Sequence, residues 1–285
     1  MRIVKRCNSL AGLSARSIAL LFLAPLFCIF PGPGYSQTDY FNPEPKTAAE
    51  AIRDVVLANR ILSYEGIFDY LGHVSVRNPE NPKTFFISRA LAPEQVTKGD
   101  ILEVDFDGNV LTKTKEAPYS ERIIHGAIFA ARPDVNCVIH AHPKELVIIS
   151  VLDMPVRFIQ HPSTIFHAGV PLFDTYNFRT SGMLIRTKEE GASVARNLGK
   201  AMGNLMRGHG ANVVGDSIPF AVRAIIELRN NVQMQLAAQQ FGQVKTITAE
   251  EAKLIANTFD RNSPKRGWNY WVARVKQAMP DLKDY

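Results

Sequence analysis

Signals for helix starts alternate with short β-forming runs along most of this chain of 285 residues. Thr47 is followed three residues later by Glu50, a capping box that precedes helically spaced apolar residues. The other expected helices span residues 121–131 and 217–240 or begin at Thr187 and Thr248. The expected strands span residues 73–77, 84–88, 101–106, 110–114 and 136–142. This alternation predicts a single α/β domain, which we assign to residues 37–285.

The first 36 residues have the order of a secretory signal peptide. A basic start is followed by an apolar run and then by helix-breaking residues, namely Arg2, Lys5 and Arg6, then Ser17–Phe30, then Pro31-Gly32-Pro33-Gly34. The apolar run is too short to span a bilayer comfortably. We therefore predict cleavage after Ser36 and export of a mature chain that is not stably inserted in a membrane. The alternative is an uncleaved N-terminal anchor.

Much of the excess positive charge lies in this leader. The formal net charge is +6, but residues 1–36 contain four basic and no acidic residues. Subtracting these four from the 33 basic residues leaves 29, against 27 acidic residues in the rest of the chain. We therefore expect no nucleic-acid partner, because phosphate binding needs a larger positive charge. Cys137 is the only cysteine after residue 36, so an internal disulfide is excluded from the mature chain.

Two histidines, His140 and His142, alternate along an expected strand. Residues i and i+2 of a strand project from the same face, so both rings can reach one metal ion. Pro143 ends this strand directly afterwards, at the carboxyl end where open α/β sheets usually place ligands. The pattern indicates two ligands of one metal, and the alternative is a pair of surface or partly buried histidines.

Two other segments carry candidate partners for this pair. His209 lies between Gly208 and Gly210, which allow close backbone approach, although an incidental histidine in a glycine-rich turn is the alternative. Glu121 stands at an expected helix start, where the helix dipole favours a carboxylate and where the side chain can face a cleft. His125 lies one turn further on the same helix face, and we interpret it as a packed histidine rather than a ligand.

The order of these residues resembles the class II aldolase and adducin family. Residues 132–142 are similar to the family pattern RPDV.aVvHtH, and residues 72–77 are similar to its earlier G..S.R strand. The resemblance covers about residues 48–242. It implies a three-layer α/β/α sandwich around a largely antiparallel sheet. It also implies fourfold-symmetric homotetramers whose active sites lie at subunit interfaces.

The resemblance also assigns roles to the four candidate residues. It implies that His140, His142 and His209 bind a divalent metal, and that Glu121 is an acid/base carboxylate that can also bind it. Zinc is the common ion, and manganese, cobalt and iron are alternatives. Three neutral imidazoles suit these ions better than calcium or magnesium, and they leave positions open for a small-molecule substrate. A metal ion bound to a hydroxy-carbonyl compound stabilises an enolate, the anion through which aldol cleavage and some decarboxylations pass.

Departures from the sugar-phosphate aldolases narrow the predicted substrate. The phosphate-binding segments of those enzymes, G-N-x-S-x-R, T-P-S-G and S-S-E, are similar to segments that here carry His73 and Ser75, Arg89, and Ser120. We predict that these four side chains bind the substrate. His73 replaces an asparagine, and Arg89 brings a planar fork suited to a carboxylate, so a phosphorylated sugar is disfavoured. The alternative for Arg89 is a surface arginine.

A proton donor is also needed, and no tyrosine matches the one that some of these aldolases use. His161 lies in the stretch after the metal-binding strand and is our candidate for this catalytic role; the alternative is a buried, hydrogen-bonded histidine. The runs GHVSVRNP, ISRALAP and ERIIHGAIFAARPDV are most similar to a branch that decarboxylates 3-hydroxy-2-methylpyridine-4,5-dicarboxylate. The resemblance therefore implies a metal-dependent carbon–carbon lyase, either a decarboxylase or an aldolase.

Three other functions stay open at this point. One is a sugar-phosphate aldolase or epimerase. Another is a non-heme iron oxygenase, because histidine and carboxylate ligands on Fe²⁺ also suit O₂ chemistry. The last is a non-catalytic interaction module like that of adducin, which is disfavoured because adducin-like relatives have lost metal ligands and this chain retains all four site residues.

Overall fold

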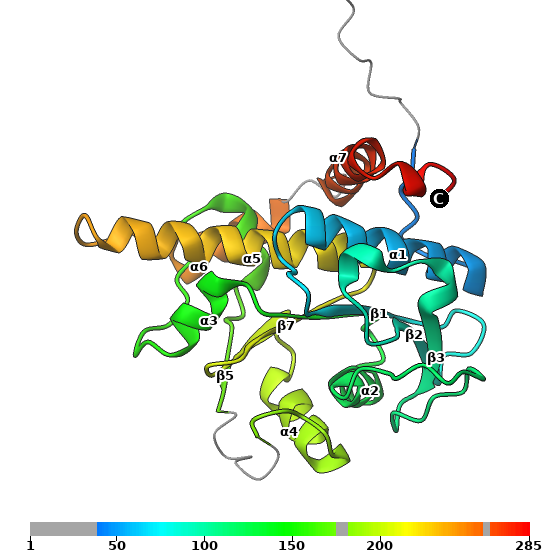
Figure 1. Cartoon of the computed structure of the whole chain (residues 1–285). Coiled ribbons are helices and arrows are strands. Elements are labelled where there is room, and N and C mark those ends of the chain that lie inside the picture. The colour runs from blue at the N-terminus through cyan, green and yellow to red at the C-terminus, as the bar shows by residue number, and fades with distance from the viewer. Residues whose placement is uncertain (1–38, 175–181, 259–262) are drawn as a thin grey trace, which may run out of the picture. The chain divides into compact units, whose positions relative to one another are not determined.

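A mixed β-sheet forms the middle layer of the protein (Figure 1). The computed structural model describes residues 39–174, 182–258 and 263–285, so the predicted signal peptide lies outside the described residues. The sheet order is β3-β2-β1-β4-β7-β6-β5. The strand bounds are β1 His73–Arg77, β2 Thr84–Ser88, β3 Ile101–Asp105, β4 Cys137–Ala141, β5 Leu172–Phe173, β6 Gly203–Met206 and β7 Gly210–Gly215. Among these described strands only β5 and β6 pair in parallel, so the sheet is largely antiparallel.

Helices cover both faces of this sheet (Figure 1). Their bounds are α1 Ala48–Tyr64, α2 Arg122–Ala131, α3 Lys144–Ser150, α4 Lys188–Leu198, α5 Ile218–Gln239, α6 Ala249–Thr258 and α7 Ser263–Ala278. Helices α1, α5 and α7 lie on one side, and α2 and α4 lie on the other. Among the described residues, none of the helices is both long enough and apolar enough to cross a bilayer.

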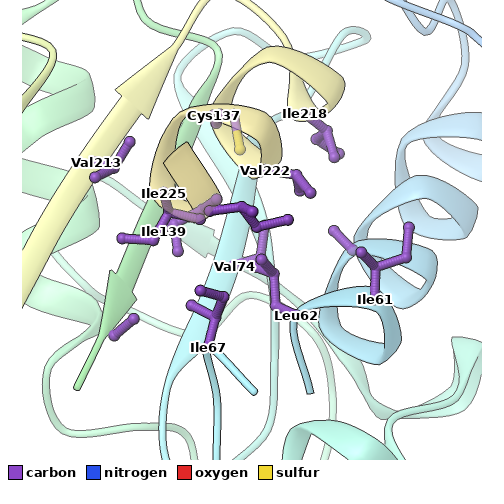
Figure 2. Packing of buried hydrophobic residues seen from close by; sticks show 14 of the residues in the cluster. Ile61, Leu62, Ile67, Val74, Cys137, Ile139, Val213, Ile218, Val222 and Ile225 are labelled. Carbon is purple, nitrogen blue, oxygen red and sulfur yellow. The ribbon is translucent and has the colours of Figure 1, made fainter. Parts of the chain in front are cut away.

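Two hydrophobic cores, one on each face, hold the layers together. Ile139 of β4 packs in the core beneath α1 and α5, whereas its neighbour Val138 packs in the core beneath α2 and α4. Successive residues of a strand point to opposite faces, which explains this division. Figure 2 shows the first core, in which Leu62 of α1 and Val222 of α5 lie close to Val74 of β1. The second core packs α2 against the sheet. The polar side chains described in the next section lie on this same face of the sheet.

Local sequence signals account for most helix starts. Thr47 and Glu50 form the predicted capping box of α1, and Thr187 forms another with Glu190 at α4. Glu121 stands directly before α2 at the N-cap, as predicted. Ser217 stands at the N-cap of α5, but its hydroxyl donates to Asp216 Oδ1 instead of accepting a bond from the helix.

The predicted strand over residues 110–114 is wrong. Val110 forms only an isolated bridge with Val104 of β3, and residues 111–117 are exposed. This segment follows β3, which is an edge strand of the sheet. The alternating pattern there buries little apolar surface, so it does not stabilise a further strand.

Candidate metal centre and active site

Polar side chains gather on the α2-facing surface of the sheet. His73 of β1 pairs in register with His140 of β4, and His140 pairs in register with Asn212 of β7. The three residues share the face of Val138, which packs beneath α2. Each of them is buried. Buried polar groups need hydrogen-bond or metal partners. This row of His73, His140 and Asn212 therefore requires further polar side chains close to this face of the sheet.

Four side chains converge beside this row. Glu121, His140, His142 and His209 each offer one ligand atom, and these atoms all lie within 4.8 Å of one another. His140 Nε2 lies 3.0 Å from His142 Nε2, and Glu121 Oε2 lies 3.6 Å from His140 Nε2 and 3.4 Å from His209 Nε2. The predicted convergence of three distant histidines and one glutamate is therefore present in the structure.

Asn212 sets the orientation of the His140 ring. Its Oδ1 accepts a hydrogen bond from His140 Nδ1 at 2.8 Å, and its Nδ2 donates to Asn204 Oδ1 at 3.0 Å. The second bond fixes which end of the Asn212 amide faces the histidine. His140 therefore carries its proton on Nδ1 and presents a bare Nε2 lone pair to the cluster, the form that binds a metal.

We expect Asn212→Ala to weaken metal binding about 10- to 100-fold, because His140 loses the partner that fixes its tautomer. A competition titration with a fluorescent zinc chelator measures this affinity. Asn59→Ala is the matched control, since Asn59 is also fully buried but lies in α1 and bonds to Val55 O. Equal zinc affinities in the Asn212→Ala variant and the unmodified protein would contradict the assigned role of Asn212.

The Glu121 carboxylate is held from two sides. Its Oε1 accepts a hydrogen bond from the Ile185 N–H at 3.0 Å, and its Oε2 faces the histidines. Burial acts to raise the pKa of Glu121, but the imidazoles of His140 and His209 beside its Oε2 outweigh burial and hold the pKa well below its usual range. Glu121 is thus ionised at neutral pH.

Both glycines around His209 have a structural reason. Gly208 has φ +65°, a left-handed conformation that glycine adopts without strain, and its N–H donates to Ser150 Oγ at 3.0 Å. A Cβ on Gly210 would lie 2.3 Å from Ala141 O and 2.8 Å from the His142 ring. The turn between β6 and β7 therefore brings His209 against the end of β4 only when position 210 has no side chain.

Gly210→Ala should destabilise the fold by about 1–3 kcal/mol, because the backbone at Ala141 has to move. The same movement displaces His142, so bound metal should fall as well. Urea unfolding with EDTA present separates the stability effect from metal loss. Gly99→Ala is the control, since a Cβ at Gly99 meets nothing closer than 3.8 Å. Matching unfolding midpoints for the two variants would contradict the close approach described above.

This donor set fits a borderline divalent ion. Imidazole nitrogens and one carboxylate oxygen suit Zn²⁺, Mn²⁺, Co²⁺ or Fe²⁺ rather than Ca²⁺ or Mg²⁺. In a tetrahedral zinc site, ligand atoms about 2.0–2.1 Å from the ion are about 3.3 Å apart. Three of the separations among these atoms, 3.0, 3.4 and 3.6 Å, lie near that value, and all four atoms lie within 4.8 Å of one another, so the cluster is compact enough to hold one ion. Burial, with the nearby His140 and His209, lowers the pKa of His142 to about 3, so its ring is neutral and able to bind.

A cavity of about 620 Å³ opens beside the cluster. Its lining consists of Leu71, Gly72, His73, Tyr119, Ser120, Glu121, His142, Gly182, Met183, Leu184, Gly208 and His209. The Tyr119 ring lies 4.5 Å from the His73 ring, and its hydroxyl donates to Leu91 O. Met183 has φ +67°, a conformation that is uncommon outside glycine and that accompanies functional sites more often than other loops.

The predicted substrate-binding residues divide into two groups. His73 and Ser120 line this cavity. Ser75 does not, because it is fully buried behind the row and its Oγ lies 2.5 Å from His125 Nδ1. His125 is fully buried and packed, as predicted, and burial lowers its pKa to about 3.

Arg89 and His161 lie elsewhere on this chain. The guanidinium of Arg89 pairs with Asp100 at 2.6 Å and with Glu116 at 3.2 Å, and it does not line the cavity. These two carboxylates already occupy the planar fork that suggested a substrate carboxylate. His161 begins the 3₁₀ helix His161–Phe166, is exposed, and does not line the cavity either. The described cavity therefore supports neither assignment.

Sequence reasoning missed the groups that hold the metal ligands in place. Asn212 lies two residues after Gly210, so in a strand the two residues face the same side of the sheet. This spacing was the sequence signal that could have placed the Asn212 side chain near His209. The Ile185 N–H carries no comparable motif. Its role depends on the contact of Ile185 with Glu121, 64 positions earlier in the chain, which is a feature of the tertiary structure.

The chain matches one protein family and is similar to several curated proteins. The family described as the class II aldolase and adducin N-terminal domain matches residues 53–236. The decarboxylase tropJ of Talaromyces stipitatus is 33% identical over 253 residues, covering 80% of this chain and 95% of that protein. A 3,4-dihydroxyphthalate decarboxylase of Arthrobacter keyseri is 28% identical over 250 residues, covering 82% and 97%.

A solved structure shows the same fold. L-fuculose 1-phosphate aldolase from Glaciozyma antarctica PI12 superposes with a TM-score of 0.72 at 24% identity, over 85% of this chain and 96% of that one. The family model matches more than half of the chain, and a relative is 33% identical over most of both proteins. The Glu/His cluster agrees with these matches. This chain therefore belongs to the class II aldolase and adducin family.

Proposed function

We propose that the protein is a divalent-metal-dependent decarboxylase that acts on an aromatic hydroxy-carboxylate, with zinc as the resident ion. The observation that carries this proposal is the cluster of Glu121, His140, His142 and His209 beside a cavity with a largely apolar rim. The two relatives described above are decarboxylases, and one of them acts on an aromatic hydroxy-dicarboxylate by its name.

The cavity favours a flat anionic ring over a sugar phosphate. Leu71, Met183, Leu184 and the Tyr119 ring offer apolar contact surface for an aromatic substrate. The described lining residues include no lysine and no arginine. A hydroxy-carboxylate can place its charge at a metal ion and so needs no cationic side chain in this lining. His73, which replaces the asparagine of the sugar-phosphate aldolases, lines the cavity and disfavours a sugar phosphate.

Each residue of the site has a part in this reaction. His140, His142 and His209 would hold the metal, which supplies Lewis-acid stabilisation of the negative charge left by the loss of CO₂. Glu121 is ionised and lies next to the ligand atoms, so it accepts a proton from the ring hydroxyl and returns a proton to the ring carbon. His73 and Ser120 line the wall where the remaining substrate oxygens bind.

A substrate screen tests the proposal directly. Purified protein loaded with Zn²⁺, Mn²⁺ or Fe²⁺ is incubated with dihydroxyphthalates, hydroxybenzoates and, as the alternative, L-fuculose 1-phosphate, and released CO₂ or aldehyde is measured. We expect CO₂ from a ring that carries adjacent hydroxyl and carboxyl groups, with equal turnover in the absence of oxygen. A strict need for O₂ would instead identify an oxygenase. Aldehyde release without CO₂ would identify an aldolase.

We also propose a homotetramer and export of the mature chain. Ile148, Val151 and Leu152 are between 41% and 58% exposed around the end of α3. Val151 also lies close to Gly208, so these apolar side chains stand near the metal centre, and contact with a second copy would cover them. Light scattering after chromatography tests the assembly, and cell fractionation with N-terminal sequencing tests export and cleavage.

A further inference from the structure

A hydrogen-bonded chain of three buried side chains runs behind the cavity wall. Ser75 Oγ lies 2.5 Å from His125 Nδ1, and His125 Nε2 lies 2.7 Å from His73 Nδ1. Ser75 and His125 are fully buried, whereas His73 is 3% exposed and lines the cavity. The chain therefore links the interior of the sheet to the cavity through two imidazole rings.

The single proton of the Ser75 hydroxyl sets the direction of this chain. Its possible acceptors are His125 Nδ1 at 2.5 Å and Val138 O at 3.4 Å. Hydrogen bonds from O–H donors are about 2.5–3.0 Å long, whereas those from N–H donors to oxygen are about 2.7–3.2 Å long. The 2.5 Å contact therefore fits donation by the Ser75 hydroxyl to His125 Nδ1 rather than donation by an N–H of His125, and the 3.4 Å contact with Val138 O is too long to compete. A neutral imidazole carries one N–H, and His125 must then carry it on Nε2, from which it donates to His73 Nδ1.

We propose that this chain locks His73 as the tautomer with its proton on Nε2, so that His73 presents a neutral N–H donor to a substrate oxygen in the cavity. The inference rests on the proposed function, because it names how the same site recognises its substrate. Nδ1 of His73 is committed to His125, which leaves Nε2 as the ring nitrogen available to a ligand. The centroid of the His73 ring lies 4.5 Å from that of Tyr119 and 5.2 Å from that of His140, and this packing restricts rotation of the ring.

The lock gives the site a preference for substrate class. A fixed N–H donor binds an oxygen acceptor, such as a second carboxylate or a carbonyl next to the metal-bound oxygens, and it disfavours a ring amine at that position. His73 is then a specificity-determining residue. Ser75 and His125 are positioning residues that act through it, which gives Ser75 a part in the site although it does not line the cavity.

The tautomer can be read without any substrate. In ¹⁵N NMR of the zinc-loaded, diamagnetic protein labelled at histidine, protonated and bare ring nitrogens have separate shifts, and the spectrum of His73→Phe assigns His73. We expect His73 to be protonated on Nε2 and His125 to be protonated on Nε2. A His73 proton on Nδ1 would overturn the proposal. Because the spectrum is recorded before substrate is added, a failure to release CO₂ counts against the proposed function alone.

A double-mutant cycle tests whether Ser75 acts through His73. Phthalate is the probe, since this dicarboxylate lacks the ring hydroxyl that the decarboxylation needs, and calorimetry measures its binding to zinc-loaded protein. His73→Phe keeps a ring between its neighbours without the N–H, and we expect at least tenfold weaker binding. Ser75→Ala releases the tautomer, and we expect about two- to tenfold weaker binding.

The combined variant separates a positioning role from a structural one. In the His73→Phe background, Ser75→Ala should cause no further loss of phthalate binding, because the donor that Ser75 controls is already gone. Equal losses from Ser75→Ala in both backgrounds would overturn the proposal. Ser163→Ala is the matched control, since Ser163 is also fully buried but bonds to Asn231 and Gln160, away from the cavity. It should leave phthalate binding unchanged.

Discussion

His140→Ala should remove bound divalent metal from the purified protein and abolish CO₂ release. His140 is fully buried, and its Nε2 lies 3.0 Å from His142 Nε2. The variant leaves a small cavity and a facing Glu121 carboxylate, and neither can replace an imidazole ligand. Loss of one of the protein ligands to a zinc ion lowers affinity steeply, because the remaining groups no longer complete the site. Metal per chain is measured by inductively coupled plasma mass spectrometry.

His167→Ala is the matched control for this experiment. His167 is exposed at the end of the 3₁₀ helix His161–Phe166 and lies outside the ligand cluster. Its removal should leave metal content and turnover unchanged. A full equivalent of metal on the His140→Ala protein would show that the ion binds elsewhere, and the assignment of all three histidines would then be wrong.

Glu121→Gln should lower turnover about 10²- to 10⁴-fold while metal remains bound. The amide keeps the shape of the side chain and can keep the bond from the Ile185 N–H. It has no basic oxygen, however, so it cannot accept the substrate proton. Turnover is measured by CO₂ release at saturating substrate, with metal content determined on the same sample.

Glu94→Gln, at an exposed position in the 3₁₀ helix Pro93–Gln95, controls for the loss of one carboxylate. It should behave like the unmodified protein. If Glu121→Gln retained near-normal turnover, Glu121 would have no role in proton transfer, and the histidine cluster would have to act with another base. If Glu121→Gln lost its metal as well, Glu121 would be a ligand first and a base second.

Much of the fold follows from local sequence patterns. The capping boxes at Thr47 and Thr187 are contacts between residues three positions apart, and both form in the structure. The strand containing His140 was predicted over residues 136–142 and is confirmed as β4, Cys137–Ala141, which is buried on both faces of a covered sheet. The segment 110–114 shows the limit of such patterns. Its alternation is local, but a strand also needs a partner and a covering layer, which lie elsewhere in the chain.

The site could be predicted as far as its residues have distinctive chemistry. The resemblance to the class II aldolase and adducin family implies that three histidines and one glutamate form a metal centre, and their side chains do converge. The environment of Arg89 could not be predicted, because its partners Asp100 and Glu116 approach it only through the fold. The position of Ser75 illustrates the same limit. The motif identifies it as important, but only the structure shows that it faces His125 rather than the cavity.

The ligand cluster draws on three parts of the chain that meet only after the sheet is complete. Glu121 precedes α2, His140 belongs to β4, and His209 lies in the turn between β6 and β7. An unfolded chain has no such assembly, so an ion that binds only the native state stabilises it by thermodynamic linkage. At a free ion concentration 100-fold above its dissociation constant this contribution is about 2.7 kcal/mol. We therefore expect the resistance of the protein to heat to rise with the free concentration of the divalent ion around it.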